Sequence, residues 1–171
     1  MRTDSPRRLT EIGLIAALYT VLTLVCQPIA FGPIQLRLSE ALTVLPLFTP
    51  TAIPGLAVGC ALSNALCIGA NPAGAWDVLF GPLATLLAAV LTRVLRNTRL
   101  WEWPIPAVLM PVAVNAAVIG PELSVIYFGF SPATCLLCMA EIAAGELITA
   151  GLGGLLLWRW LPASLFSEPH D

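Results

Sequence analysis

The sequence predicts an all-α, polytopic membrane protein with six transmembrane helices and both termini in the cytoplasm. Of its 171 residues, 58% are hydrophobic and only 11% are charged, whereas soluble domains carry about 25% charged residues. The mean hydropathy is +0.88. A soluble protein of this size could not bury so much apolar surface, but a lipid bilayer can cover it.

Long apolar segments give the expected helices, since a spanning helix needs about 20 apolar residues. The segment that starts at residue 38 contains three prolines, so we expect a short helix to residue 48 and another over residues 53–68. The connections are short, which predicts a single domain over residues 1–171. The other expected spans are residues 12–31, 77–95, 105–119 or somewhat longer, and 132–160.

The arginines fix the predicted orientation, because cytoplasmic loops are enriched in basic residues. All eight basic residues are Arg. With six spans and a cytoplasmic N-terminus, seven of them lie inside, including the cluster at positions 93, 96 and 99. Merging the second and third spans would place that cluster outside. We therefore prefer six spans.

Polar side chains gather on the outer half of the predicted bundle. A charged group at a helix centre costs roughly 2.5–3.5 kcal/mol, so it usually faces a partner or a wet cavity. The sequence thus predicts an outward-facing pocket for a ligand with N–H donors or a positive charge. The candidate binding residues are Arg37, Glu40, Asn64, Trp76, Asp77, Asn115, Glu141 and Glu146.

Simpler explanations exist for several of these residues. Arg37 and Glu40, three positions apart, could pair with each other on a helix surface. Asp77 could cap the fourth span, and Trp76 could anchor the helix at the membrane interface. Asn64 could bond only to a neighbouring helix.

The remaining acids and amides have similar alternatives. Asn115, like Asn64, could join two helices. Glu141 and Glu146 point about 140° apart on a helix, so at most one should face the centre of a pocket. Glu122 follows Gly120 and Pro121, and we expect it to be an exposed loop acid.

Several classes of function lack the residues they need. The chain has no G-x-x-x-x-G-K-[ST] motif for ATP and no Ser/His or Cys/His pair for nucleophilic catalysis. The sequence also has no basic patch of the kind that nucleic-acid-binding proteins carry. Cys135 and Cys138 form a C-x-x-C motif without a second pair, and His170 lies in the polar tail. We therefore expect no enzyme activity, catalytic residue, cofactor or metal site.

Small residues lie at helical spacing along the first span. They allow another helix to approach closely, whether from this chain or from a partner. We expect this face to dock a partner through Gly13, Ala16, Ala17 and Thr20.

Several segments together resemble the QueT family, whose members are similar to the substrate-binding (S) components of energy-coupling factor transporters. The resemblance covers nearly the whole chain. The most specific segment is GPIQLRLSEAL at positions 32–42, and the others are Ala16-Ala17-Leu18-Tyr19, Gly59 with Asn64, Ala75-Trp76-Asp77 and Gly145-Glu146.

This resemblance implies a multi-pass protein of a bacterial or archaeal plasma membrane that captures a queuosine precursor from outside. Such precursors are 7-deazaguanines, one of which bears an aminomethyl group. A transmembrane coupling subunit, which meets the small-residue face of the first helix, and two ATPases are the implied partners. An S component for another vitamin-like ligand, and a membrane scaffold or channel subunit, are the alternatives.

Overall fold

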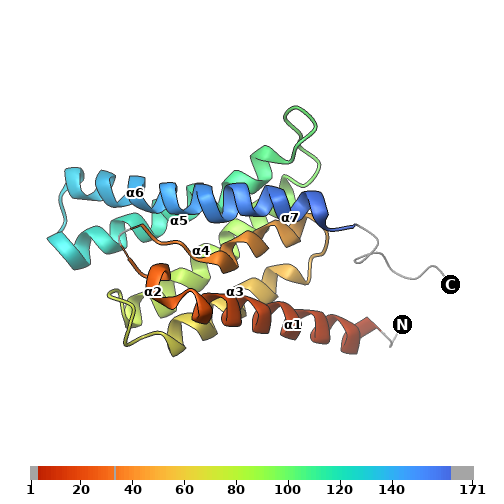
Figure 1. Ribbon diagram of the computed structural model, residues 1–171, viewed down its shortest axis with the longest axis horizontal. Helices are drawn as coiled ribbons and strands as arrows, with labels where there is room; N and C mark the ends of the chain where they lie inside the picture. Colours follow the sequence, from red (N-terminus) through yellow and green to blue (C-terminus); the bar gives the residue numbers. More distant parts are fainter. Residues whose placement is uncertain (1–3, 33, 163–171) are drawn as a thin grey trace.

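The protein is described by a computed structural model that covers residues 4–32 and 34–162. These residues form a bundle of helices aligned with the long axis, and the described chain begins and ends at the same end of it (Figure 1). In chain order, the elements are α1 (Asp4–Val25), α2 (Gln27–Ala30), the 3-10 helix η1 (Leu38–Leu47), α3 (Ala52–Leu66), α4 (Ala75–Val94), α5 (Ile105–Phe128), α6 (Pro132–Glu146), the π-helical segment η2 (Leu147–Gly153) and α7 (Gly154–Trp160).

Four helical stretches in the described chain are long and apolar enough to cross a membrane: Pro6–Val25, Ala75–Val94, Ile105–Phe128 and Pro132–Trp160. The chain is therefore a helical, multi-pass membrane protein. The last stretch is continuous across α6, η2 and α7. The proline-containing segment divides into η1 and α3, as predicted. At about 2.0 Å per residue for η1 and 1.5 Å for α3, each is shorter than the roughly 30 Å hydrocarbon core.

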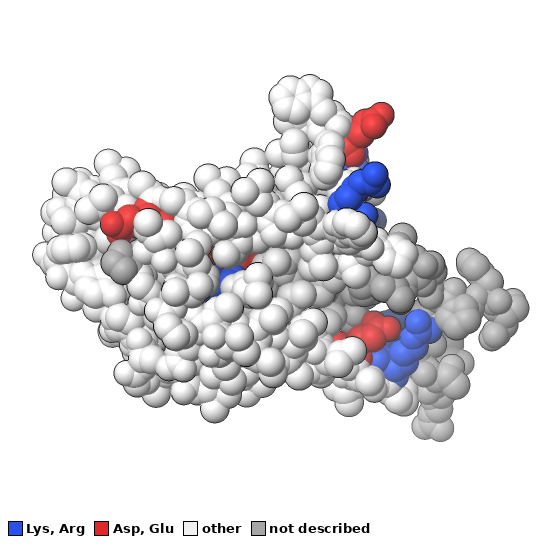
Figure 2. All heavy atoms as spheres, in the orientation of Figure 1, with Lys and Arg blue, Asp and Glu red and all other residues white. Residues whose placement is uncertain are grey.

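The surface fits a bilayer. Large aliphatic side chains along the long helices are exposed, including Leu14 at 68%, Leu79 at 57% and Leu136 at 67%. On the face shown in Figure 2, most charged side chains lie toward one end of the molecule, and uncharged atoms cover the middle. Charged atoms also appear there at the bottom of a hollow. Lipid tails would cover the apolar belt.

Arg93 on α4 closes the end of η1. Its Nη1 atom donates to the carbonyl of Pro46 at 3.0 Å and to that of Leu47 at 3.3 Å. The last carbonyls of a helix have no partner within the helix, so this contact satisfies two of them. The contact also links the short helix η1 to the long helix α4.

Close approach of α1 and α3 depends on small residues. The hydroxyl of Thr20 donates to the carbonyl of Gly59 at 3.2 Å. A Cβ atom built on Gly59 would lie 2.8 Å from the Cβ of Tyr19 and 2.9 Å from the carbonyl oxygen of Ala16. These atoms belong to backbone or near-backbone positions, so only glycine allows this separation of the two helices.

Replacing Gly59 with Ala should therefore destabilise the protein by about 1–3 kcal/mol, the usual effect of overpacking. Gly13 is the matched control, because a Cβ there meets nothing within 4 Å. Gly13→Ala should be neutral or should add up to about 1 kcal/mol from helix propensity. Thermal unfolding of both variants in one detergent would test this, and equal midpoints for the two would contradict the packing.

The structure corrects one expectation for α5. This helix continues through Pro121 to Phe128, so Glu122 lies within a helix and not in an exposed loop. Both carboxylate oxygens of Glu122 are buried. Packing against α6 accounts for the continuation, because Gly120 lets Met139 approach to 2.5 Å from the position of a Cβ atom.

Candidate functional site

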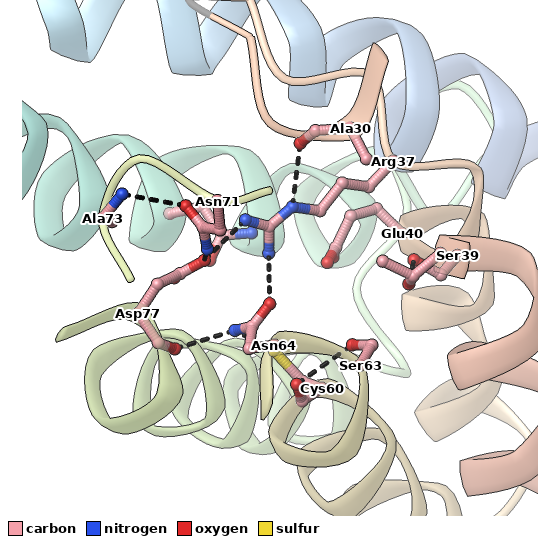
Figure 3. A network of polar contacts seen from close by, with 12 residues as sticks. Ala30, Arg37, Ser39, Glu40, Cys60, Ser63, Asn64, Asn71, Ala73 and Asp77 are labelled. Carbon is pink, nitrogen blue, oxygen red and sulfur yellow. Dashed lines mark hydrogen bonds and ion pairs between the residues drawn. The ribbon is translucent and has the colours of Figure 1, made fainter. Parts of the chain in front are cut away.

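Arg37 occupies the centre of a buried polar network (Figure 3). It has an extended backbone conformation immediately before η1, and only 6% of its surface is exposed. Its Nε atom donates to the carbonyl of Ala30 at 3.2 Å, and its Nη2 atom donates to Oδ2 of Asp77 at 2.8 Å. The guanidinium carbon lies 4.7 Å from the ring centroid of Phe31, a cation–π distance. These contacts fix the guanidinium inside the bundle.

Two asparagines hold Asp77 in place on the first turn of α4. Asn71, in the loop between α3 and α4, donates to Oδ2 of Asp77 at 2.6 Å. Asn64 on α3 donates to the backbone carbonyl of Asp77 at 2.7 Å and accepts from Arg37 Nη1 at 3.5 Å. The loop, α3 and α4 are therefore joined through one carboxylate and one guanidinium.

A small cavity lies beside Arg37, bounded by η1, α4, α5 and α6. It gives the centre of a water molecule only about 10 Å³ of room, about what one water needs. Its polar lining comes from four separate parts of the chain. The lining residues are Gln35, Arg37, Glu40, Gly81, Thr85, Asn115, Ile119, Ile142 and Glu146.

Each carboxylate on this cavity has one bonded oxygen and one free oxygen. Tyr19 donates its hydroxyl to Oε1 of Glu40, and Asn115 donates to Oε1 of Glu146 at 2.6 Å. Among the described residues, Oε2 of Glu40 and Oε2 of Glu146 are buried without a hydrogen-bond partner, as is Oδ1 of Asp77. A buried acceptor without a donor is costly, so these oxygens suit donors supplied by a ligand.

Gly145 on α6 allows the segment before η1 to cover the cavity. A Cβ atom there would collide with the backbone carbonyl of Gln35. The segment that carries Arg37 therefore contacts α6 at Gly145, the residue that precedes Glu146.

Four predicted binding residues line the cavity: Arg37, Glu40, Asn115 and Glu146. Asn64 and Asp77 do not line it, but they contact Arg37 directly. The ion pair of Arg37 is with Asp77, not with Glu40, because the guanidinium turns into the bundle toward α4. Asp77 makes no capping bond, and Gly74 is the N-cap residue of α4.

Two predicted binding residues lie elsewhere. Glu141 does not line the cavity, and its helix face differs from that of Glu146. Trp76 is 61% exposed and stacks on Phe80 at 5.9 Å between ring centroids, in a groove on the outside of the bundle. Trp76 thus points away from the cavity.

Sequence reasoning missed Tyr19, Gln35 and Asn71. Tyr19 is fully buried but looks like one more apolar residue in a long apolar span. Tyr19 and Gln35 both lie inside segments that carry the resemblance, which was a usable signal. Asn71 is in a loop, where asparagine is common, so no signal distinguished it.

The small-residue face of α1 is partly buried against α3 and partly exposed. Ala16 and Thr20 are buried, and both contact Gly59 of α3. Gly13 and Ala17 are exposed. The surface open to a partner therefore includes Gly13 and Ala17 but not the other two.

Comparison with known proteins places the chain in a family. The family model described as "QueT transporter" matches residues 9–162. A protein of Lactococcus lactis subsp. cremoris (strain MG1363) named "Queuosine precursor transporter QueT" is 34% identical over 90 residues. That match covers 51% of this chain and 50% of the relative, so it spans about half the length of each. No solved structure matches the chain.

The family match extends over nearly all of the described residues, from α1 to α7. It includes the segment before η1, the two helices η1 and α6 that carry Glu40 and Glu146, and the loop whose Asn71 donates to Asp77. The chain belongs to the QueT transporter family.

Proposed function

We propose that this protein is the substrate-binding subunit of an energy-coupling factor importer, and that it captures a 7-deazaguanine precursor of queuosine from outside the cell. The observation that carries the proposal is the pair of unbonded oxygens on Glu40 and Glu146, two residues that line one cavity beside Arg37. The family match and the name of the Lactococcus relative support the choice of substrate.

The chemistry of a 7-deazaguanine complements these groups. Its pyrimidine edge presents adjacent N–H donors, which one carboxylate can accept together. An aminomethyl substituent is a cation and would pair with the second carboxylate. Asn115 and Gln35 have both donors and acceptors for the remaining ring atoms. Arg37 supplies a donor for the carbonyl oxygen of the base.

Capture requires the cavity to open. A bicyclic base has several times the volume of a water molecule, and the cavity accommodates only about one. The segment around Gln35 is the element best placed to move, because it covers the cavity and has no regular helix of its own before η1. We propose that this segment acts as a lid over the substrate.

The orientation we propose has six crossings, with both termini and the loop between α4 and α5 in the cytoplasm. It places the arginine-rich loop inside and the Arg37 network toward the outside. In a cysteine-free background, a cysteine at Asn97 should resist impermeant thiol reagents in intact cells and react after permeabilisation. A cysteine at Gly129, between α5 and α6, is the control that should react from outside. Labelling of the Asn97 site in intact cells would contradict the orientation.

Transport requires a motor, because we find no nucleotide-binding motif in the sequence. We propose that a transmembrane coupling subunit docks on the exposed side of α1, at Gly13 and Ala17, and connects the protein to two ATPases. Small residues at this spacing let a helix of the partner come close.

Ala17→Trp should abolish uptake of a radiolabelled deazaguanine while the purified protein still binds it, because the indole fills the exposed docking surface and Ala17 does not line the cavity. Leu87→Trp, at an exposed position on α4, is the matched control and should transport normally. Normal uptake by the Ala17 variant would show that the docking surface is elsewhere. Uptake by cells that lack the partner ATPases would contradict the proposed mechanism itself.

A further inference from the structure

A second cavity lies on the outside of the bundle, between α4 and α5. It has a volume of about 410 Å³, within the range of small-molecule sites. It shares no lining residue with the central cavity. Adjacent residues face the two spaces: Phe80 and Val118 line the outer groove, and Gly81 and Ile119 line the central cavity. The two are therefore separate sites on opposite sides of the contact between α4 and α5.

The groove has an aromatic wall. Trp76 and Phe80 stand one helical turn apart, and their rings are nearly parallel, with 15° between their planes and 5.9 Å between their centroids. Phe130, from the loop after α5, lies at the same groove. Val118, Pro121, Val125 and Ile126 complete the lining. Such walls accept a planar or apolar body.

One charged residue lines this apolar groove. Both carboxylate oxygens of Glu122 are buried, and neither has a hydrogen-bond partner among the described residues. Burying a carboxylate without donors is costly, and a cation that donates to it would offset part of that cost. Aromatic faces next to the carboxylate also attract cations.

We propose that this groove is a second binding site, for a small organic cation that has an ammonium group on an aromatic or planar body. The ammonium group donates to Glu122, and the planar body lies against Trp76 and Phe80. The match of charge and size favours a small soluble amine over a lipid, because one carboxylate and two aromatic rings line a groove that has the volume of a small-molecule site. The inference does not depend on the identity of the molecule in the central cavity.

Phenethylammonium is a suitable probe, and 2-phenylethanol is its uncharged analogue. The full chain, in phosphatidylcholine nanodiscs, should bind radiolabelled phenethylammonium saturably and one-to-one in equilibrium dialysis, after subtraction of binding to empty discs. The alcohol should compete at least about tenfold more weakly, because it lacks the charge. Equal competition by the two compounds would overturn the proposal.

Glu122→Gln should weaken phenethylammonium binding at least about tenfold, whereas the matched variant Glu141→Gln should leave it unchanged. Phe80→Leu tests the aromatic wall independently and should weaken binding several-fold. Phe80→Leu still tests the proposal if Glu122→Gln fails to fold. Unchanged binding in folded Glu122→Gln, or in Phe80→Leu, would overturn the proposal.

Two further experiments distinguish the proposed site from a lipid-binding groove and from binding in the central cavity. Phosphatidylethanolamine, which carries a primary ammonium, should not displace the probe when it is added to the discs. Displacement would identify a lipid as the occupant and overturn the proposal. Glu146→Gln should keep phenethylammonium binding while its deazaguanine binding weakens more than about tenfold. Loss of phenethylammonium in that variant, with retention in Glu122→Gln, would place the probe in the central cavity and refute the second site.

Discussion

Arg37→Met should destabilise the protein by about 3–5 kcal/mol, the usual effect of removing one partner of a buried ion pair. The carboxylate of Asp77 would remain buried without its cation, which is 2.8 Å away in the structure. Asn71 would still donate to Asp77, but one amide does not neutralise a charge. Thermal or denaturant-induced unfolding in detergent would measure the loss.

A second substitution separates an unpaired charge from a simple loss of packing. Adding Asp77→Leu to Arg37→Met should recover much of the lost stability, because neither charge is then left alone. Arg8→Met, at an exposed position on α1, is the control and should change stability by no more than about 0.5 kcal/mol. A double variant as unstable as the sum of the two single variants would contradict the ion-pair account.

Glu146→Gln should weaken deazaguanine binding by more than about 1.5 kcal/mol, the lower value for a hydrogen bond to a charged group. That is more than tenfold in affinity. The new amide has one acceptor where the carboxylate had two, and its NH₂ group must face either Asn115 or the donors of the ligand. Calorimetric titration of the purified protein would give the change.

Glu141→Gln provides the matched comparison for that titration. It removes a carboxylate from the same helix, five positions away and outside the cavity, so affinity should stay within about twofold of the wild type. Equal losses in the two variants would mean that general electrostatics, and not contact with the cavity, controls binding.

The sequence best predicted the features that follow from proline geometry and from the cost of burying charge in a membrane. Prolines 46, 50 and 54 predicted the division between η1 and α3, because a proline within a helix removes a hydrogen bond. The high cost of buried charge made Arg37, Glu40 and Glu146 stand out. These residues do lie on one cavity, although Glu146 is more than 100 positions from the other two.

The partners of the charged side chains, and the directions in which side chains point, were harder to predict. Spacing along the chain made Glu40 the nearest partner for Arg37, but the guanidinium reaches Asp77, 40 positions away. Trp76 adjoins Asp77 in sequence, yet neighbouring residues on a helix point about 100° apart. Trp76 therefore lines the outer groove, whereas Asp77 contacts Arg37 inside the bundle. Pro121 suggested a helix end near Glu122. Contacts with α6 outweighed that local preference.

We propose that the cavity beside Arg37 binds a deazaguanine through the unbonded oxygens of Glu40 and Glu146. Calorimetric titration of the full chain, in nanodiscs and without partner subunits, with 7-aminomethyl-7-deazaguanine tests this binding. We expect saturable one-to-one binding that disappears in the double variant Glu40→Gln, Glu146→Gln. Absence of saturable binding by the folded wild-type protein, or equal affinity in the double variant, would contradict it.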